Sequence, residues 1–252
     1  MYKPKILAGL VLVLYVLFII FEFSAEYNIS ILLDALVVPV IALTYILLVK
    51  KKNIFFLLFV ICYSLTDILG VVTHYLLYYN FTYEESLIYY DYDYFISSIL
   101  YILSYTFLLI RVLSTISIKY IFKHFKIHLL VLTVLNVYLI YVLQVIVGSS
   151  LDSENQFYIE FAYNTVILLL LSSALLNYFY RDNKKSLYLF IGSLFVVFSE
   201  VLDVAYIYID QKSFLSIFST TLVLAAFYFY YQQTKFSDKL LNKENDSYMV
   251  LE

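Results

Sequence analysis

Eight long apolar runs dominate this sequence and limit what it can fold into. Each run has about the 20 residues that a helix needs to cross a bilayer, and each is too continuously apolar to be a strand of a membrane barrel. Hydrophobic residues make up 63% of the chain and charged residues only 14%, far from the balance of a soluble domain. The sequence therefore predicts an all-α polytopic transmembrane bundle, with spans at 6–22, 29–49, 54–78, 94–113, 128–148, 157–180, 187–209 and 213–232.

The distribution of charge predicts the orientation of the spans. All basic residues except Lys212 fall at the chain ends and in the loops on one side of an eight-span arrangement, and acidic residues such as Glu22 and Asp93 mark the loops on the other side. Since Lys and Arg concentrate in cytoplasmic loops, both termini are expected in the cytoplasm. We expect one bundle domain over residues 1–234, a polar cytoplasmic tail over 235–252, and a location in the plasma membrane, which in a bacterium is the inner membrane.

Two carboxyl groups are predicted at similar depth in two different spans. Asp67 and Glu200 each lie thirteen residues after the cytoplasmic start of their span, which places both about 20 Å into the membrane. Asp203 lies one turn beyond Glu200, whereas Asp34 and Glu160 lie closer to the outer ends, where we expect water. Ionisable residues at membrane depth face the bundle interior, so Asp67 and Glu200 are expected to converge on one site.

Other polar side chains share the helical faces of these acids. Tyr63 and His74 follow the stripe of Asp67, and Ser199 adjoins Glu200. Two carboxyl groups in a site without water do not share one pKa value. One of them stays protonated and can act as an acid, while the other is ionised and can act as a base. Such a pair suits acid-catalysed cleavage of an enol ether or acetal, and it suits proton-coupled transport equally well. The alternative is that each acid is only a hydrogen-bond partner between helices.

Other chemistries find little support in the sequence. The three histidines are scattered, which argues against a zinc site, and no phosphate loop or nucleophile elbow is present. We therefore expect no metal and no cofactor. The basic loops are explained by membrane topology, so nucleic acid is not an expected partner.

Several short motifs resemble the YhhN family of lysoplasmalogenase-like membrane proteins. "CYSLTDIL" places Asp67 at the aspartate of the Gly-Asp pair that ends a small-residue stretch in the family, and "GSLFVVFSE" matches a seventh-span motif that ends in Ser-Asp. "FYFYYQQ" offers Gln232 for the glutamine that closes the last span. The chain departs from the family pattern at three places. Glu200 stands where the family has Asp, and Val38, just before Pro39, stands where the family has Lys. Ser104–Tyr105 stands where the family has Ala-His.

The resemblance implies hydrolysis of the vinyl-ether bond of lysoplasmalogens, and hence a membrane lipid or lysolipid as the bound partner. Asp67 and Glu200 would then be catalytic, one protonating the enol ether and the other guiding water. The supporting groups would be Asp203, Tyr63, His74, Ser199, Tyr105 and Gln232. Two alternatives stay open: a non-catalytic protein that binds a lipid or a partner, and a proton-coupled carrier. The scarcity of Gly and Pro, with 4 and 2 residues, argues against a carrier built from broken repeat helices.

Overall fold

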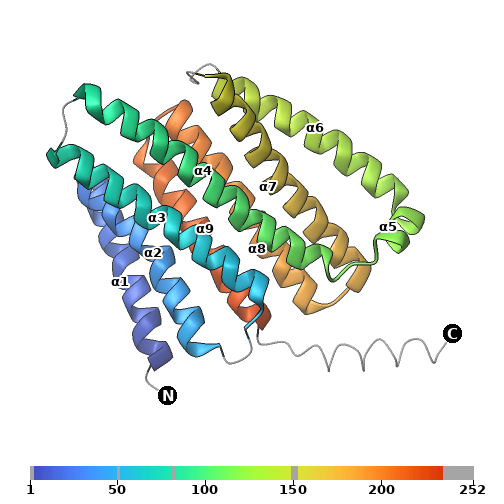
Figure 1. The fold of residues 1–252 in the computed structure, drawn as a ribbon. Helices are drawn as coiled ribbons and strands as arrows, with labels where there is room; N and C mark the ends of the chain where they lie inside the picture. The colour runs from blue at the N-terminus through green and yellow to red at the C-terminus, as the bar shows by residue number, and fades with distance from the viewer. Residues whose placement is uncertain (1–2, 50–51, 81–82, 149–152, 235–252) are drawn as a thin grey trace.

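The computed structural model describes residues 3–49, 52–80, 83–148 and 153–234, so the predicted tail over 235–252 lies outside the described residues. Within these ranges the chain forms one short and eight long helices and no strand, as predicted (Figure 1). The helices are α1 (Lys3–Phe23), α2 (Tyr27–Leu48), α3 (Ile54–Asn80), α4 (Tyr83–Leu113), α5 (Ile118–His124), α6 (Lys126–Gly148), α7 (Glu154–Arg181), α8 (Lys184–Tyr208) and α9 (Ser213–Thr234).

All eight predicted spans correspond to helices long and apolar enough to cross a membrane. Most boundaries agree with the prediction to within three residues, and the larger differences are the start of α4 and an additional short helix. Helix α4 begins at Tyr83 rather than at residue 94, because its polar first turns contain neither Gly nor Pro and continue the helix toward the outer end. Helix α5, which the sequence analysis did not predict, is a seven-residue helix between α4 and α6.

The long helices pack side by side, with α1 and α6 at the two edges of the bundle (Figure 1). Aromatic rings fill the centre. Phe59 on α3 is fully buried, and its ring contacts those of Tyr105 on α4 and of Phe227 and Tyr230 on α9. With 4 glycines and 51 Tyr and Phe residues in the chain, the helices meet through rings rather than through close backbone crossings.

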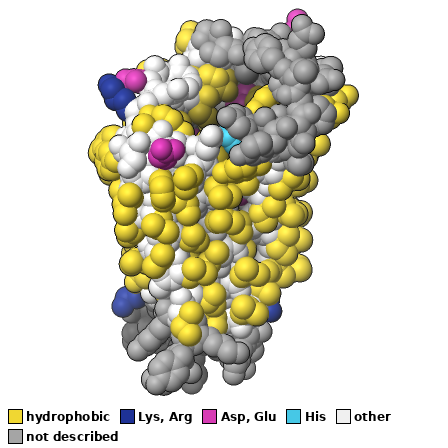
Figure 2. All heavy atoms as spheres, turned by 90° about the vertical axis from the view of Figure 1, so that its left-hand side faces the viewer, with side chains coloured by type: hydrophobic (Ala, Val, Ile, Leu, Met, Phe, Trp, Pro, Cys, Tyr) yellow, Lys and Arg dark blue, Asp and Glu magenta, His cyan; other side chains and the backbone are white. Residues whose placement is uncertain are grey.

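The outer surface of the bundle is apolar, as contact with lipid requires. Figure 2 shows hydrophobic side chains over the middle of one face, with the charged surface side chains toward its two ends. Helix α6 exposes large side chains such as Val134, which is 64% exposed. At the end of α8, Lys212 bonds to Asp210 at 2.6 Å, and this hydrogen bond raises the pKa of the lysine. The eight apolar helices make the chain an integral membrane protein; its orientation stays a prediction.

Close packing of α8 against α9 depends on Gly192. A Cβ atom added there would lie 2.6 Å from Cε1 of Tyr230, whose ring is fully buried. We expect Gly192→Ala to lower the free energy of unfolding by about 1–3 kcal/mol, because the ring has no space into which it can move. Thermal unfolding in detergent measures this change.

Gly9→Ala is the matched control, since an added Cβ at Gly9 meets nothing within 4 Å. The control should unfold at the wild-type temperature or higher, because Ala favours helix over Gly. Equal stability of Gly192→Ala and wild type would contradict the packing described here.

Candidate functional site

A cavity of about 460 Å³ lies inside the bundle, toward the end where α1 and α8 finish. It is called the acidic cavity here, because five carboxylic side chains from five helices line it. No Lys, Arg or His is among the described residues that line it. The five acids are Glu22 of α1, Asp34 of α2, Asp67 of α3, Asp93 of α4 and Asp203 of α8.

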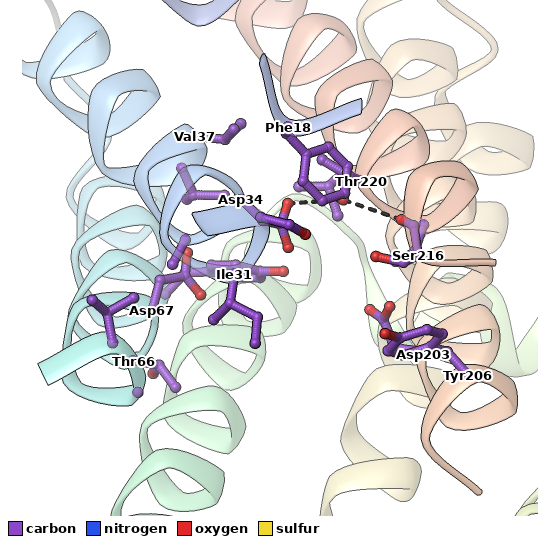
Figure 3. A pocket seen from close by; sticks show the side chains of 18 of the residues that line it. Phe18, Ile31, Asp34, Val37, Thr66, Asp67, Asp203, Tyr206, Ser216 and Thr220 are labelled. Carbon is purple, nitrogen blue, oxygen red and sulfur yellow. Dashed lines mark hydrogen bonds between the residues drawn. The ribbon is translucent and has the colours of Figure 1, made fainter. Parts of the chain in front are cut away.

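Helical periodicity brings the α3 residues to the cavity. Tyr63, Thr66, Asp67 and Gly70 follow the three- and four-residue spacing of one helix face, and all four line the acidic cavity. Figure 3 shows Asp67 and Asp203 extending from opposite walls of the cavity. The α3 and α8 acids therefore face the same cavity.

Hydroxyl groups from neighbouring helices hold three of the acids. Tyr101 of α4 donates a hydrogen bond to Asp67 Oδ1 at 3.0 Å. Thr220 of α9 donates to Asp34 Oδ1 at 2.8 Å (Figure 3), and Thr73 of α3 donates to Oδ1 of Asp93 at 3.0 Å. These bonds tie α4 to α3 and α9 to α2 across the cavity and fix the direction of each carboxyl group.

Glu22 differs from the other cavity acids in its burial. Its side chain is only 3% exposed, and Oε2 accepts a hydrogen bond from the Ser30 hydroxyl. Oε1 is buried and has no hydrogen-bond partner among the described residues. A buried oxygen without a partner is costly and uncommon in proteins. Since Glu22 lines the acidic cavity, Oε1 is an acceptor that a ligand with donor groups could satisfy.

Glu200 lies in a different environment from Asp67. Its two carboxyl oxygens accept hydrogen bonds from the hydroxyls of Tyr105 on α4 and Tyr163 on α7. Glu200 is not among the described residues that line the acidic cavity. Two tyrosine rings connect Glu200 to Asp67. Tyr105, which bonds Glu200, stacks on Tyr101 with 6.4 Å between the ring centroids, and Tyr101 bonds Asp67.

The remaining predicted site residues divide between the cavity and other places. Asp203 and Tyr63 line the acidic cavity. The Ser199 hydroxyl bonds to its own helix at Val196 O. His74 lies 3.3 Å from Oδ1 of Asn28 and does not line the cavity. Gln232 lines a second cavity, which is apolar, beside the C-terminal half of α9.

Sequence reasoning missed three of the five cavity acids. Asp93 was expected in an outer loop, and this was wrong, since it lies on α4. Glu22 was counted with the outer charges at the end of the predicted span 6–22, and it lies one residue before the end of α1. Asp34 was expected near water, yet it lies seven residues inside α2, about 10 Å from its start, and bonds to α9. The number of residues between the start of the span and Asp34 was the signal in the sequence that could have revealed its depth. Glu160, expected in water as well, accepts a 2.7 Å bond from Tyr94 of α4.

Among the described residues, no three His, Cys, Asp or Glu side chains are arranged to hold a metal ion. What the arrangement offers is several carboxyl groups and hydroxyl donors around one cavity. Such groups can transfer protons and can bind a polar or cationic group.

Comparisons of the chain with protein-family models, with curated proteins and with solved structures find no match. The resemblance to the YhhN family therefore rests on the short motifs quoted above, and the function has to be argued from the geometry of the chain.

The two tyrosine hydroxyls on Glu200 should stabilise the contact of α4 and α7 with α8. Tyr105→Phe and Tyr163→Phe each remove one donor to a buried carboxyl group. We expect each variant to lose about 1–3 kcal/mol of unfolding free energy, measured by denaturation in detergent.

Tyr158→Phe is the control on α7, since Tyr158 is 66% exposed. It should unfold like wild type. Because both hydroxyls bond to one carboxyl group, the double variant should lose an amount that differs from the sum of the single losses. Strict additivity, or no loss in either single variant, would argue against a shared network.

Proposed function

We propose that the acidic cavity binds a single-chain ether lysolipid and hydrolyses its vinyl-ether bond by carboxyl acid–base chemistry. The observation that carries the proposal is that Asp67 of α3 and Asp203 of α8 line one cavity inside a membrane-spanning bundle. This pairing keeps Asp67 from the sequence analysis and replaces Glu200 by the acid one turn further along α8.

The chemistry needs one carboxylic acid, one carboxylate and one water molecule. The acid protonates the vinyl carbon remote from the ether oxygen, and the π electrons of the double bond form the new C–H bond. The resulting oxocarbenium ion is attacked by water, whose proton passes to the carboxylate. The second carboxyl group then donates the proton that it took from water to the glycerol oxygen, as the hemiacetal C–O bond to that oxygen breaks. The proton of the hemiacetal hydroxyl passes to the carboxylate that protonated the vinyl carbon. The products are a fatty aldehyde and a glycerophospho-alcohol, and both carboxyl groups return to their starting states.

The surroundings of the two acids support these roles. The Tyr101 hydroxyl fixes the direction of Asp67, and a positioned carboxyl group is what proton transfer requires. Glu200 would act at a distance, by holding Tyr105 against the Tyr101 ring. The excess of acids over bases in the lining favours a lipid headgroup that carries an amine.

A second candidate function is lipid binding without catalysis. One observation favours it: Glu200, which the sequence pairs with Asp67, is engaged by two tyrosine hydroxyls and does not line the acidic cavity. If the reaction needs Glu200 itself next to the substrate, this arrangement would bind the lipid and leave it intact.

Aldehyde release from a lysoplasmalogen by the purified protein tests the proposal. Asp67→Asn and Asp203→Asn keep the shape of each side chain and remove its acid–base function. We expect each to lower kcat by about 10²–10⁴-fold, the usual contribution of a general acid or base. Glu200→Gln should lower it less, because Glu200 acts through the tyrosines.

Asp210→Asn is the control, since Asp210 is exposed and its carboxyl group bonds Lys212 outside the acidic cavity. It should retain wild-type activity. Unchanged aldehyde release in both cavity variants would refute the Asp67–Asp203 mechanism. A folded wild type that binds the lipid and releases no aldehyde would establish the second candidate instead.

A further inference from the structure

A second cavity, of about 350 Å³, lies among α1, α2, α3 and α9. It is called the apolar cavity here, because no charged side chain is among the described residues that line it. Its walls include Val11 of α1, Ile41 of α2, Val60 of α3 and Leu224 of α9. Neither the acid–base chemistry nor the polar contacts of the acidic cavity involve it.

The residues that line the two cavities lie close together along three helices. On each of three helices, a residue lining the acidic cavity lies within one helical turn of a residue lining the apolar cavity. These pairs are Val38 and Ile41 on α2, Tyr63 and Val60 on α3, and Val223 and Leu224 on α9. One turn of helix spans only about 5 Å. Along these helices, a polar space and an apolar space therefore lie at neighbouring depths of one bundle.

We propose that the apolar cavity holds the hydrocarbon chain of a single-chain amphiphile whose polar group lies in the acidic cavity. The inference rests on the proposed function, and it adds a chain-binding site to it. The chemistry of such a molecule matches that of the two cavities, since its polar group suits the acidic cavity and its hydrocarbon chain suits the neighbouring apolar cavity. A protein helix, about 10 Å across, would not fit into 350 Å³.

The position of α1 supports entry of the chain from the membrane. Helix α1 is at the edge of the bundle, and the Tyr15 hydroxyl bonds Thr221 of α9 at 2.6 Å. The α1 residues that line the apolar cavity, among them Val11, precede Tyr15 by one or two turns. On the other side of α1, Val13 is 51% exposed and faces away from the cavity lining. Helix α1 thus forms one wall of the apolar cavity at the edge of the bundle, next to the surrounding lipid.

Recognition of the chain would depend on shape. Lipid tails are already in an apolar medium, so burial of hydrocarbon alone gives little preference for the cavity over the bilayer. Close packing of a chain against the cavity walls provides the preference. A side chain that occupies the cavity should therefore exclude the lipid chain.

A photo-crosslinking experiment tests this inference. The probe is a 1-O-alkyl lysophospholipid with a saturated ether bond, which the proposed reaction cannot cleave, and with a diazirine at the end of its chain. Val11→Phe fills the apolar cavity, and Val13→Phe makes the same change two residues away on the lipid-facing side. Crosslinking to the purified protein in nanodiscs is mapped by mass spectrometry, with and without excess unlabelled lipid.

We expect competed labelling of the cavity walls on α1 and α9 in wild type and in Val13→Phe, and about tenfold less in Val11→Phe. Equal labelling of the two variants, or labelling spread over exposed faces such as that of α6, would overturn the inference. Its failure is distinguishable from failure of the proposed function, because the probe reports binding alone and aldehyde release reports chemistry alone.

Discussion

Hydrocarbon offers no hydrogen-bond partner, and this constraint governs both the helices and the position of every polar side chain in the bundle. Many hydroxyls bond to a carbonyl of their own helix, as Ser64 does to Val60 O. Others pair between helices, as Asn136 does with Ser172. Arg111, buried near the end of α4, donates to Gln233 of α9 at 2.6 Å. Many polar groups inside the bundle are thus satisfied within the protein, and Oε1 of Glu22 is an exception among the described residues.

The same constraint explains why the acids gather. Carboxyl groups at membrane depth are costly in contact with lipid, and here five of them turn toward one interior space from five helices. The hydroxyl of Tyr101 donates a hydrogen bond to Asp67, and that of Thr220 donates one to Asp34. Because lipid surrounds the bundle and polar groups surround the cavity, a molecule with one polar and one apolar part is the ligand that suits both environments.

The sequence predicted the spans well, because length and apolar composition alone decide which segments can cross a bilayer. It also predicted that Asp67 faces the interior. It could not predict which α8 acid shares a cavity with Asp67. Glu200 and Asp203 are three residues apart, so their directions differ by only about 60° around the helix axis. A modest rotation of α8 decides between them, and packing against α4, α7 and α9 determines that rotation. The start of α4 was missed for a local reason, since its first turns are too polar to be read as a span.

The most direct test of the account is an experimental structure of the protein with a 1-O-alkyl lysophospholipid bound. The account predicts the lipid headgroup in the acidic cavity, within hydrogen-bond distance of Asp67 or Asp203, and the chain in the apolar cavity beside Val11. A headgroup bound outside the acidic cavity, or a lipid found only on the outer surface of the bundle, would contradict it.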